Sequence, residues 1–209
     1  MEEKLTEYKS YYPDGEIHSK EFRRGEYFEG ERKSWYENGQ PWVSEFYKNG
    51  KREGERKMWF PNGTLKVVSF YRDGELDGEY KSWHITGGMF ERAFYRKGKL
   101  EGERKIWYKN GQLQEHQFCR NGEFEGTYRS WYESGRPMVK NFYSNGIWTG
   151  ERKRWYENGY LASYFFYRQR SEKSFTLRKT RILLKLRKRL YISDIQLLDS
   201  FLIHDLLNV

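Results

Sequence analysis

The stretch ERKSWYENGQPWVSEFYKNGKREG, residues 31–54, decides the fold, because most of the chain repeats it. It contains two Asn-Gly pairs, Asn38-Gly39 and Asn49-Gly50. Such pairs are typical of two-residue hairpin turns whose central residues both have positive φ. The runs beside them, residues 31–36 and 41–47, are rich in aromatic residues and too short for helices. One unit therefore predicts two strands joined by a tight turn.

The unit recurs every 24 residues, without an insertion, from residue 7 to residue 167. Three glycine columns hold 18 of the 20 glycines, and a phenylalanine column begins at Phe22. The tryptophan column consists of Trp35, Trp59, Trp83, Trp107, Trp131 and Trp155. A fixed period of this length is typical of repeat architectures. We predict an elongated, mostly β meander of consecutive hairpins with about fourteen strands, in which each unit is stabilised by its neighbours.

The composition agrees with a thin repeat sheet. Aromatic residues make up 19% and charged residues 33% of the 209 residues, and the formal net charge is +9. So many aromatic residues exclude a disordered chain, while so many charges exclude a thick apolar core. The chain has no apolar run of about 18 residues and no apolar segment typical of a secretory signal. A single cysteine, Cys119, fits a reducing compartment, so we expect a cytoplasmic protein.

Both faces of the predicted sheet carry aromatic and charged residues. Pairing about Asn38-Gly39 sets Trp35 opposite Trp42 and Glu31 opposite Phe46, so these side chains share a face with Lys33. The opposite face then takes Ser34, Arg32, Tyr36 and Tyr47. No face is purely apolar, which favours an open, twisted single-layer sheet stabilised by ladders of side chains.

The pattern W-Y-x-N-G-x-x…F-Y-x-N-G-x-x-x-G resembles the MORN-type repeat, in the variant form of bacterial YwqK-type antitoxin proteins and of arrays in large DNA viruses. The resemblance covers residues 7 to 170 and predicts seven repeats after a lead-in of residues 1–6. It implies an elongated sheet of hairpins that serves as a scaffold for proteins or at membranes. One departure is visible, since the family often closes the repeat with His-Gly where this chain has Glu53-Gly54, Asp77-Gly78 and Glu101-Gly102.

No motif of the sequence predicts an enzyme, a metal site or a cofactor. His84 takes the place of a tyrosine in its column, and His18 and His116 fall at variable strand positions. The glutamate column recurs in nearly every repeat beside a lysine column, whereas a catalytic pair is singular. Charge ladders across strands explain both columns. Cys119 replaces a tyrosine, and we expect it to pack inertly rather than to act in redox chemistry.

A nucleic-acid platform is also disfavoured. Residues 1–170 carry 31 basic and 26 acidic residues, a nearly balanced charge. Tryptophans one repeat apart lie two strands apart, roughly 9–10 Å, which is wide for a stack of successive bases. Lysine stems that cover the indole rings explain the neighbouring columns equally well.

The pattern ends after Tyr167, and residues 171–209 have a different composition. Residues 171–192 carry eight basic residues and one acidic residue, and they predict a basic amphipathic helix. Ser193 to Gln196 matches a capping box that begins a second, apolar helix. The two helices either cap the open sheet edge or bind an anionic membrane or a partner. The candidate lipid-binding residues are Arg178, Arg181, Lys185 and Lys188.

The leading hypothesis is a non-enzymatic scaffold for protein–protein interaction. The candidate partner-binding residues are the six tryptophans of the column above together with Phe46, Phe70, Phe94 and Phe142, since aromatic side chains dominate binding hot spots. Two alternatives remain: peripheral membrane association through the basic helix, and an antitoxin-like role that rests on the resemblance alone.

Overall fold

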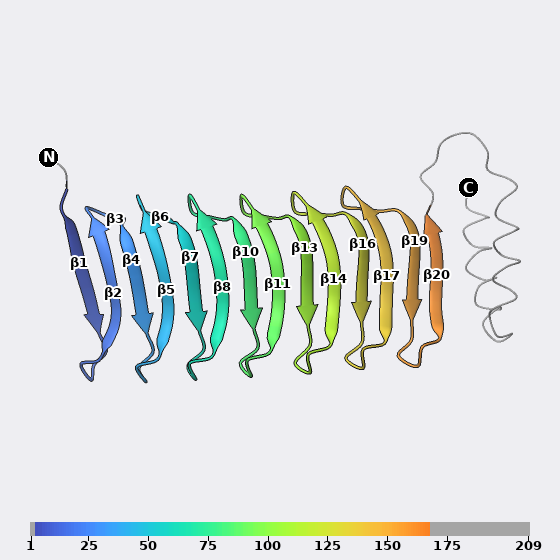
Figure 1. Cartoon of the computed structure of the whole chain (residues 1–209), viewed down its shortest axis with the longest axis horizontal. Coiled ribbons are helices and arrows are strands. Elements are labelled where there is room, and N and C mark those ends of the chain that lie inside the picture. The colour runs from blue at the N-terminus through green and yellow to red at the C-terminus, as the bar shows by residue number, and fades with distance from the viewer. Residues whose placement is uncertain (1–2, 168–209) are drawn as a thin grey trace, which may run out of the picture. The chain divides into compact units, whose positions relative to one another are not determined.

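A computed structural model describes residues 3–167, and these residues form one antiparallel β-sheet without a helix. The fourteen long strands are β1 (Leu5–Tyr11), β2 (Ile17–Arg24), β4 (Gly30–Trp35), β5 (Pro41–Lys48), β7 (Gly54–Trp59), β8 (Leu65–Arg72), β10 (Gly78–Trp83), β11 (Met89–Arg96), β13 (Gly102–Trp107), β14 (Leu113–Arg120), β16 (Gly126–Trp131), β17 (Pro137–Ser144), β19 (Gly150–Trp155) and β20 (Leu161–Tyr167). Figure 1 shows them side by side in chain order. The predicted meander is confirmed.

Six two-residue strands lie at the turns between consecutive hairpins. They are β3 (Tyr27–Phe28), β6 (Lys51–Arg52), β9 (Glu75–Leu76), β12 (Lys99–Leu100), β15 (Glu123–Phe124) and β18 (Ile147–Trp148). Each continues into the next long strand after one irregular residue, such as Glu53. Between the pairs Tyr47–Arg52 and Ser44–Lys57 the chain of β6 and β7 has two more residues than β5. This bulge explains the glycine column that contains Gly30 and Gly54, because the bulge requires a positive φ and Gly54 has a φ of 76°.

The two Asn-Gly pairs of a unit form different loops. Asn49 and Gly50 have φ of 50° and 75°, as the prediction of a two-residue turn requires. At the other pair only Gly39 has positive φ, at 77°. The Gly39 amide donates to the Tyr36 carbonyl, and the Tyr36 amide donates to the Gln40 carbonyl. The loop between Tyr36 and Gln40 therefore has three residues, 37–39. The prediction of a two-residue turn at Asn38-Gly39 is therefore wrong.

The longer loop shifts the pairing beside it. Glu31 lies opposite Phe46 and Lys33 opposite Ser44, as predicted, but Trp35 lies opposite Pro41. Trp42 is the extra residue of a β-bulge, and the same shift recurs in every hairpin. The predicted pair of Trp35 with Trp42 is wrong, because the bulge moves the register by one residue.

Burial is unequal on the two faces of this single layer. Along β5, Val43, Glu45 and Tyr47 are buried, while Trp42, Phe46 and Lys48 are exposed. We call the side with Tyr47 the Tyr face and the side with Phe46 the Phe face. The Tyr face buries small side chains, such as Ser69 and Ala93, beneath longer neighbours. Aromatic and arginine side chains stack there, as in the pairs Phe28–Tyr47 and Phe124–Tyr143, each with centroids 5.0 Å apart.

Residues 168–209 lie outside the described part of the chain, and so do the predicted C-terminal helices. In residues 3–167 no helix meets the length and apolarity needed to cross a membrane.

Candidate functional site

The Phe face presents a row of exposed phenylalanine rings, one for each repeat. Six of them are between 36% and 57% exposed, namely Phe46, Phe70, Phe94, Phe118, Phe142 and Phe166. Phe22, in the first repeat, is half-buried. The row lies opposite the glutamate column, since Phe46 pairs with Glu31 and Phe70 with Glu55. The sequence-based set named Phe46, Phe70, Phe94 and Phe142 and missed Phe118 and Phe166, which their places in the column would have identified.

The tryptophans of the sequence-based set occupy a different position. All six are half-buried. They lie at the ends of their strands beside the three-residue loops, away from the phenylalanine row. Five of their backbone carbonyls contact a tyrosine hydroxyl or a histidine nitrogen of the preceding repeat at hydrogen-bond distance. The tryptophan column therefore contributes to the seam between repeats.

That seam is a ladder of tyrosine hydroxyls. Tyr36 donates to the Trp59 carbonyl at 2.8 Å, and Tyr12, Tyr108 and Tyr132 make the same bond one repeat on. His84 takes the place of a tyrosine, and its Nε2 lies 3.1 Å from the Trp107 carbonyl oxygen. His84 thus keeps the contact that the tyrosines of its column make with the next repeat. Phe60 occupies the same column without a hydroxyl group.

The acidic residue that closes each of the first five repeats binds the turn of the next unit. The Glu53 carboxylate accepts a hydrogen bond from the Asp73 amide at 2.9 Å, and Glu101 accepts one from Asn121 at 2.9 Å. The same bond recurs from Glu29, Asp77 and Glu125. Each donor is the first residue of a turn and has positive φ. The departure from His-Gly thus has a structural role in this chain.

The glutamate and lysine columns of the Phe face form ion pairs, mostly along one strand. Lys33 lies 2.7 Å from Glu31, and the pair is about half exposed. Equivalent pairs join Lys57 to Glu55, Lys81 to Glu79, Lys105 to Glu103 and Lys153 to Glu151. Some glutamates also reach across strands, as Glu103 does to His116 at 2.8 Å. The predicted ladder exists, although it runs along strands as well as across them.

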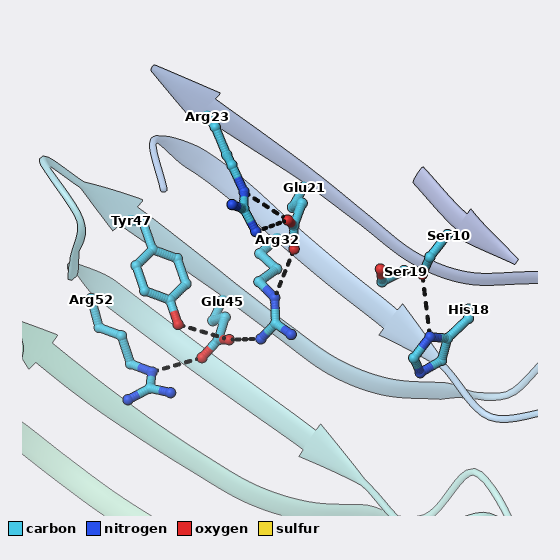
Figure 2. A network of polar contacts seen from close by, with 9 residues as sticks. All are labelled: Ser10, His18, Ser19, Glu21, Arg23, Arg32, Glu45, Tyr47 and Arg52. Atoms are coloured by element: carbon cyan, nitrogen blue, oxygen red, sulfur yellow. Dashed lines mark hydrogen bonds and ion pairs between the residues drawn. The ribbon is translucent and has the colours of Figure 1, made fainter. Parts of the chain in front are cut away.

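Figure 2 shows the most buried charge, Glu45 on the Tyr face. Its carboxylate accepts hydrogen bonds from Arg32 at 2.7 Å and Arg52 at 2.8 Å, and from the Tyr47 hydroxyl at 3.1 Å. Arg56 adds a third guanidinium at 3.1 Å. Burial raises the pKa of Glu45, but the hydrogen bonds from Arg52 and Arg32 outweigh it, so that the net pKa is lowered.

This arginine cluster around Glu45 does not resemble a catalytic centre. The Glu45 side chain is only 1% exposed, and three guanidinium groups and the Tyr47 hydroxyl surround its carboxylate. A general acid or base must reach a proton of the substrate, and Glu45 is closed to it. The cluster continues through Arg32 to Glu21 and Arg23, so it links the first repeats of the sheet. Its role is to stabilise the Tyr face.

The remaining reactive side chains lie in structural positions. Cys119 is buried on the Tyr face, and burial raises the pKa of its thiol. His18 contacts the Ser10 hydroxyl at 3.2 Å and stacks against Tyr12. Among residues 3–167, no group of three or more His, Cys, Asp or Glu side chains is placed to bind a metal ion.

A model of the MORN repeat variant matches five segments that together cover just over half of the chain, residues 5–23, 28–49, 52–74, 100–119 and 124–145. The chain therefore belongs to the MORN repeat family in its variant form. The unmatched residues 75–99 and 146–167 nevertheless form hairpins with the same register. No curated protein matches the chain. MORN repeats are generally non-enzymatic modules that mediate interactions with proteins or membrane lipids.

Proposed function

We propose that the chain is a non-enzymatic scaffold that binds a protein partner along the Phe face. The observation that carries the proposal is the row of exposed phenylalanine rings on one side of a single-layer sheet. On the Tyr face, side chains such as Val43 and Tyr47 are buried by their neighbours. On the Phe face, by contrast, Phe46, Phe94 and Phe142 are each more than 40% exposed. Aromatic side chains of this kind dominate the energetics of protein interfaces.

The geometry favours an extended partner. Neighbouring phenylalanines of the row lie two strands apart, roughly 9–10 Å, so a partner that crosses the sheet meets a ring at regular intervals. Charged side chains border the row, since Glu31 and Lys33 lie beside Phe46. An apolar centre with a polar rim is the usual composition of a protein interface.

Crosslinking and affinity capture from native lysate test this proposal. The full chain is compared with the double variant Phe70→Ser/Phe94→Ser, which removes two rings of the row. The control Ile85→Ser/Ile147→Ser removes two apolar side chains that are exposed at turns. We expect a protein partner that the full chain and the control capture and the double variant loses. Equal capture by all three proteins would refute a role of the Phe face.

A second candidate function is association with an anionic membrane surface through residues 171–192. The charge of this segment supports the proposal, because its sequence contains eight basic residues and one acidic residue. In a liposome flotation assay with phosphatidylserine vesicles, we expect the full chain to float. Replacement of Arg178, Arg181, Lys185 and Lys188 by glutamate should abolish flotation. Equal flotation of both proteins would contradict this mechanism.

A further inference from the structure

One repeat breaks the charge pattern of the Phe face. At the position of Glu31, Glu55, Glu79, Glu103 and Glu151, the sixth repeat has Thr127. The lysine that pairs with this glutamate elsewhere is replaced by Arg129. Within residues 3–167 the Arg129 guanidinium makes no ion pair or hydrogen bond, and its side chain is exposed, whereas the lysines of its column are half-buried. The repeat thus keeps the cation and omits its carboxylate.

The glutamates of the neighbouring repeats on the Phe face are already paired with other basic residues. Across the sheet Arg129 lies opposite His116 of β14 and Lys140 of β17. Glu103 already binds both Lys105 and His116. On the other side, Glu151 lies 2.6 Å from Lys153 and 3.6 Å from Lys140. Both of these carboxylates are therefore shared, and neither pairs with Arg129.

The missing glutamate side chain coincides with a depression in the surface. Its volume is about 550 Å³, and its lining includes Phe118, Phe142, Thr127 and Arg129. Glu101 and Glu125 also line it, and their carboxylates accept hydrogen bonds from the Asn121 and Asn145 amides. A smaller depression of about 180 Å³ lies beside Phe142 and also includes Thr127. The short side chain of Thr127, which lies opposite Phe142, thus borders open space on the Phe face. A cation, two exposed rings and a hollow meet at this one position.

We propose that this depression, the Arg129 site, binds an acidic side chain of a protein partner. A partner aspartate or glutamate supplies the carboxylate that Thr127 omits, and it accepts two hydrogen bonds from the Arg129 guanidinium. The proposal rests on the proposed function of the Phe face, and it places the specificity of that face in the sixth repeat.

The spacing along β16 defines what the partner segment looks like. Thr127, between the two phenylalanine rings, and Arg129 are two residues apart on one strand. An extended partner segment also presents side chains to one face at every second residue, about 6.6 Å apart. An apolar side chain between Phe118 and Phe142 therefore places an acidic side chain two residues away over Arg129. The predicted recognition sequence is an apolar residue, any residue, then Asp or Glu, in either chain direction.

Selection from a library of random dodecapeptides displayed on phage, with the full chain as bait, tests the sequence preference. We expect the selected peptides to be enriched in this apolar–x–acidic pattern relative to the unselected library. The proposal is overturned if the selected peptides are not enriched in acidic residues, or if no peptide is selected above background. Binding of phosphatidylserine vesicles that depends on Arg129, without selection of acidic peptides, also overturns it.

Fluorescence anisotropy with the most enriched peptide then tests the site. Thr127→Glu restores the residue of the other repeats and provides an internal partner for Arg129, so the sheet stays folded while the site closes. We expect Thr127→Glu and Arg129→Glu each to raise the Kd at least about tenfold, as loss of a charge-assisted hydrogen bond does. The control Lys57→Glu changes the same column away from the depression and should leave the Kd within about twofold.

Binding of the peptide that is unaffected by Thr127→Glu and Arg129→Glu refutes the Arg129 site. The lysate capture with Phe70→Ser/Phe94→Ser is independent of this result, because those residues lie outside the depression. Failure of the site and failure of the proposed function are thereby distinguished.

Discussion

Replacement of Glu45 by glutamine removes the charge at the centre of the arginine cluster and keeps the shape of the side chain. Removal of one partner from a buried ion pair costs about 3–5 kcal/mol. Here the side chains of Arg32, Arg52 and Arg56 are between 20% and 40% exposed, so water solvates them again in part. We therefore expect Glu45→Gln to lower the free energy of unfolding by about 2 kcal/mol at pH 7.

The matched control is Glu31→Gln on the Phe face, where the carboxylate and Lys33 are both more than 40% exposed. An exposed pair of this kind contributes at most about 0.5 kcal/mol, so its loss should change little. Urea unfolding followed by tryptophan fluorescence measures both variants. A Glu45→Gln shift no larger than that of Glu31→Gln would refute the assigned role of the cluster.

The pH dependence of the free energy of unfolding tests the same role of Glu45 by a second measurement. The pKa of Glu45 is lowered from its ordinary value of 4.5, so the folded state binds the Glu45 proton more weakly than the unfolded state does. The stabilisation is therefore complete above pH 4.5 and is lost as the pH falls through the folded-state pKa. The difference between the native protein and Glu45→Gln should shrink below that pH. A difference that persists unchanged to pH 3 would contradict the assignment.

Three further substitutions test the contacts between repeats. Phe60→Tyr adds the missing hydroxyl of the tyrosine ladder opposite the Trp83 carbonyl and should stabilise the chain by about 1 kcal/mol in urea unfolding. Lys97 has a φ of 48°, so Lys97→Asn should raise the melting temperature, because asparagine adopts positive φ more readily. Glu101→Ala removes the acceptor of the Asn121 amide, and hydrogen exchange at that amide should accelerate about fivefold, as loss of about 1 kcal/mol implies.

The sequence was sufficient to predict the hairpins but not the geometry of every loop. Glycine and aromatic columns determine the period, and β-propensity determines the strands. The two Asn-Gly pairs, however, are identical as dipeptides, yet both residues have positive φ at Asn49-Gly50 and only Gly39 does at the first pair. The same three-residue loop also forms at Gly87 and Gly135, which no Asn-Gly pair precedes, so the dipeptide alone does not determine the loop.

The candidate site was predictable in part for a similar reason. The phenylalanine column follows from strand alternation, and the structure leaves those rings exposed. The tryptophan column was chosen on residue type alone, yet its half-buried position depends on the bulge at Trp42 and on the tyrosine ladder. The Arg129 site is recognised by the ion-paired lysines of the other repeats together with the depression beside Thr127, and the depression is visible only in the folded chain.

The tyrosine ladder and the acidic turn contacts both join one repeat to the next, and they donate in opposite directions: Tyr36 donates forward to the Trp59 carbonyl, whereas the Asp73 amide donates back to Glu53. Most internal units therefore present a hydroxyl donor and a carboxylate acceptor to the unit that follows them. Deletion or duplication of 24 consecutive residues rejoins equivalent strands and turns, so the number of units is set by the gene and not by a closed geometry. Such a protein can change its length in a single genetic event while the new junction keeps the same strand pairing.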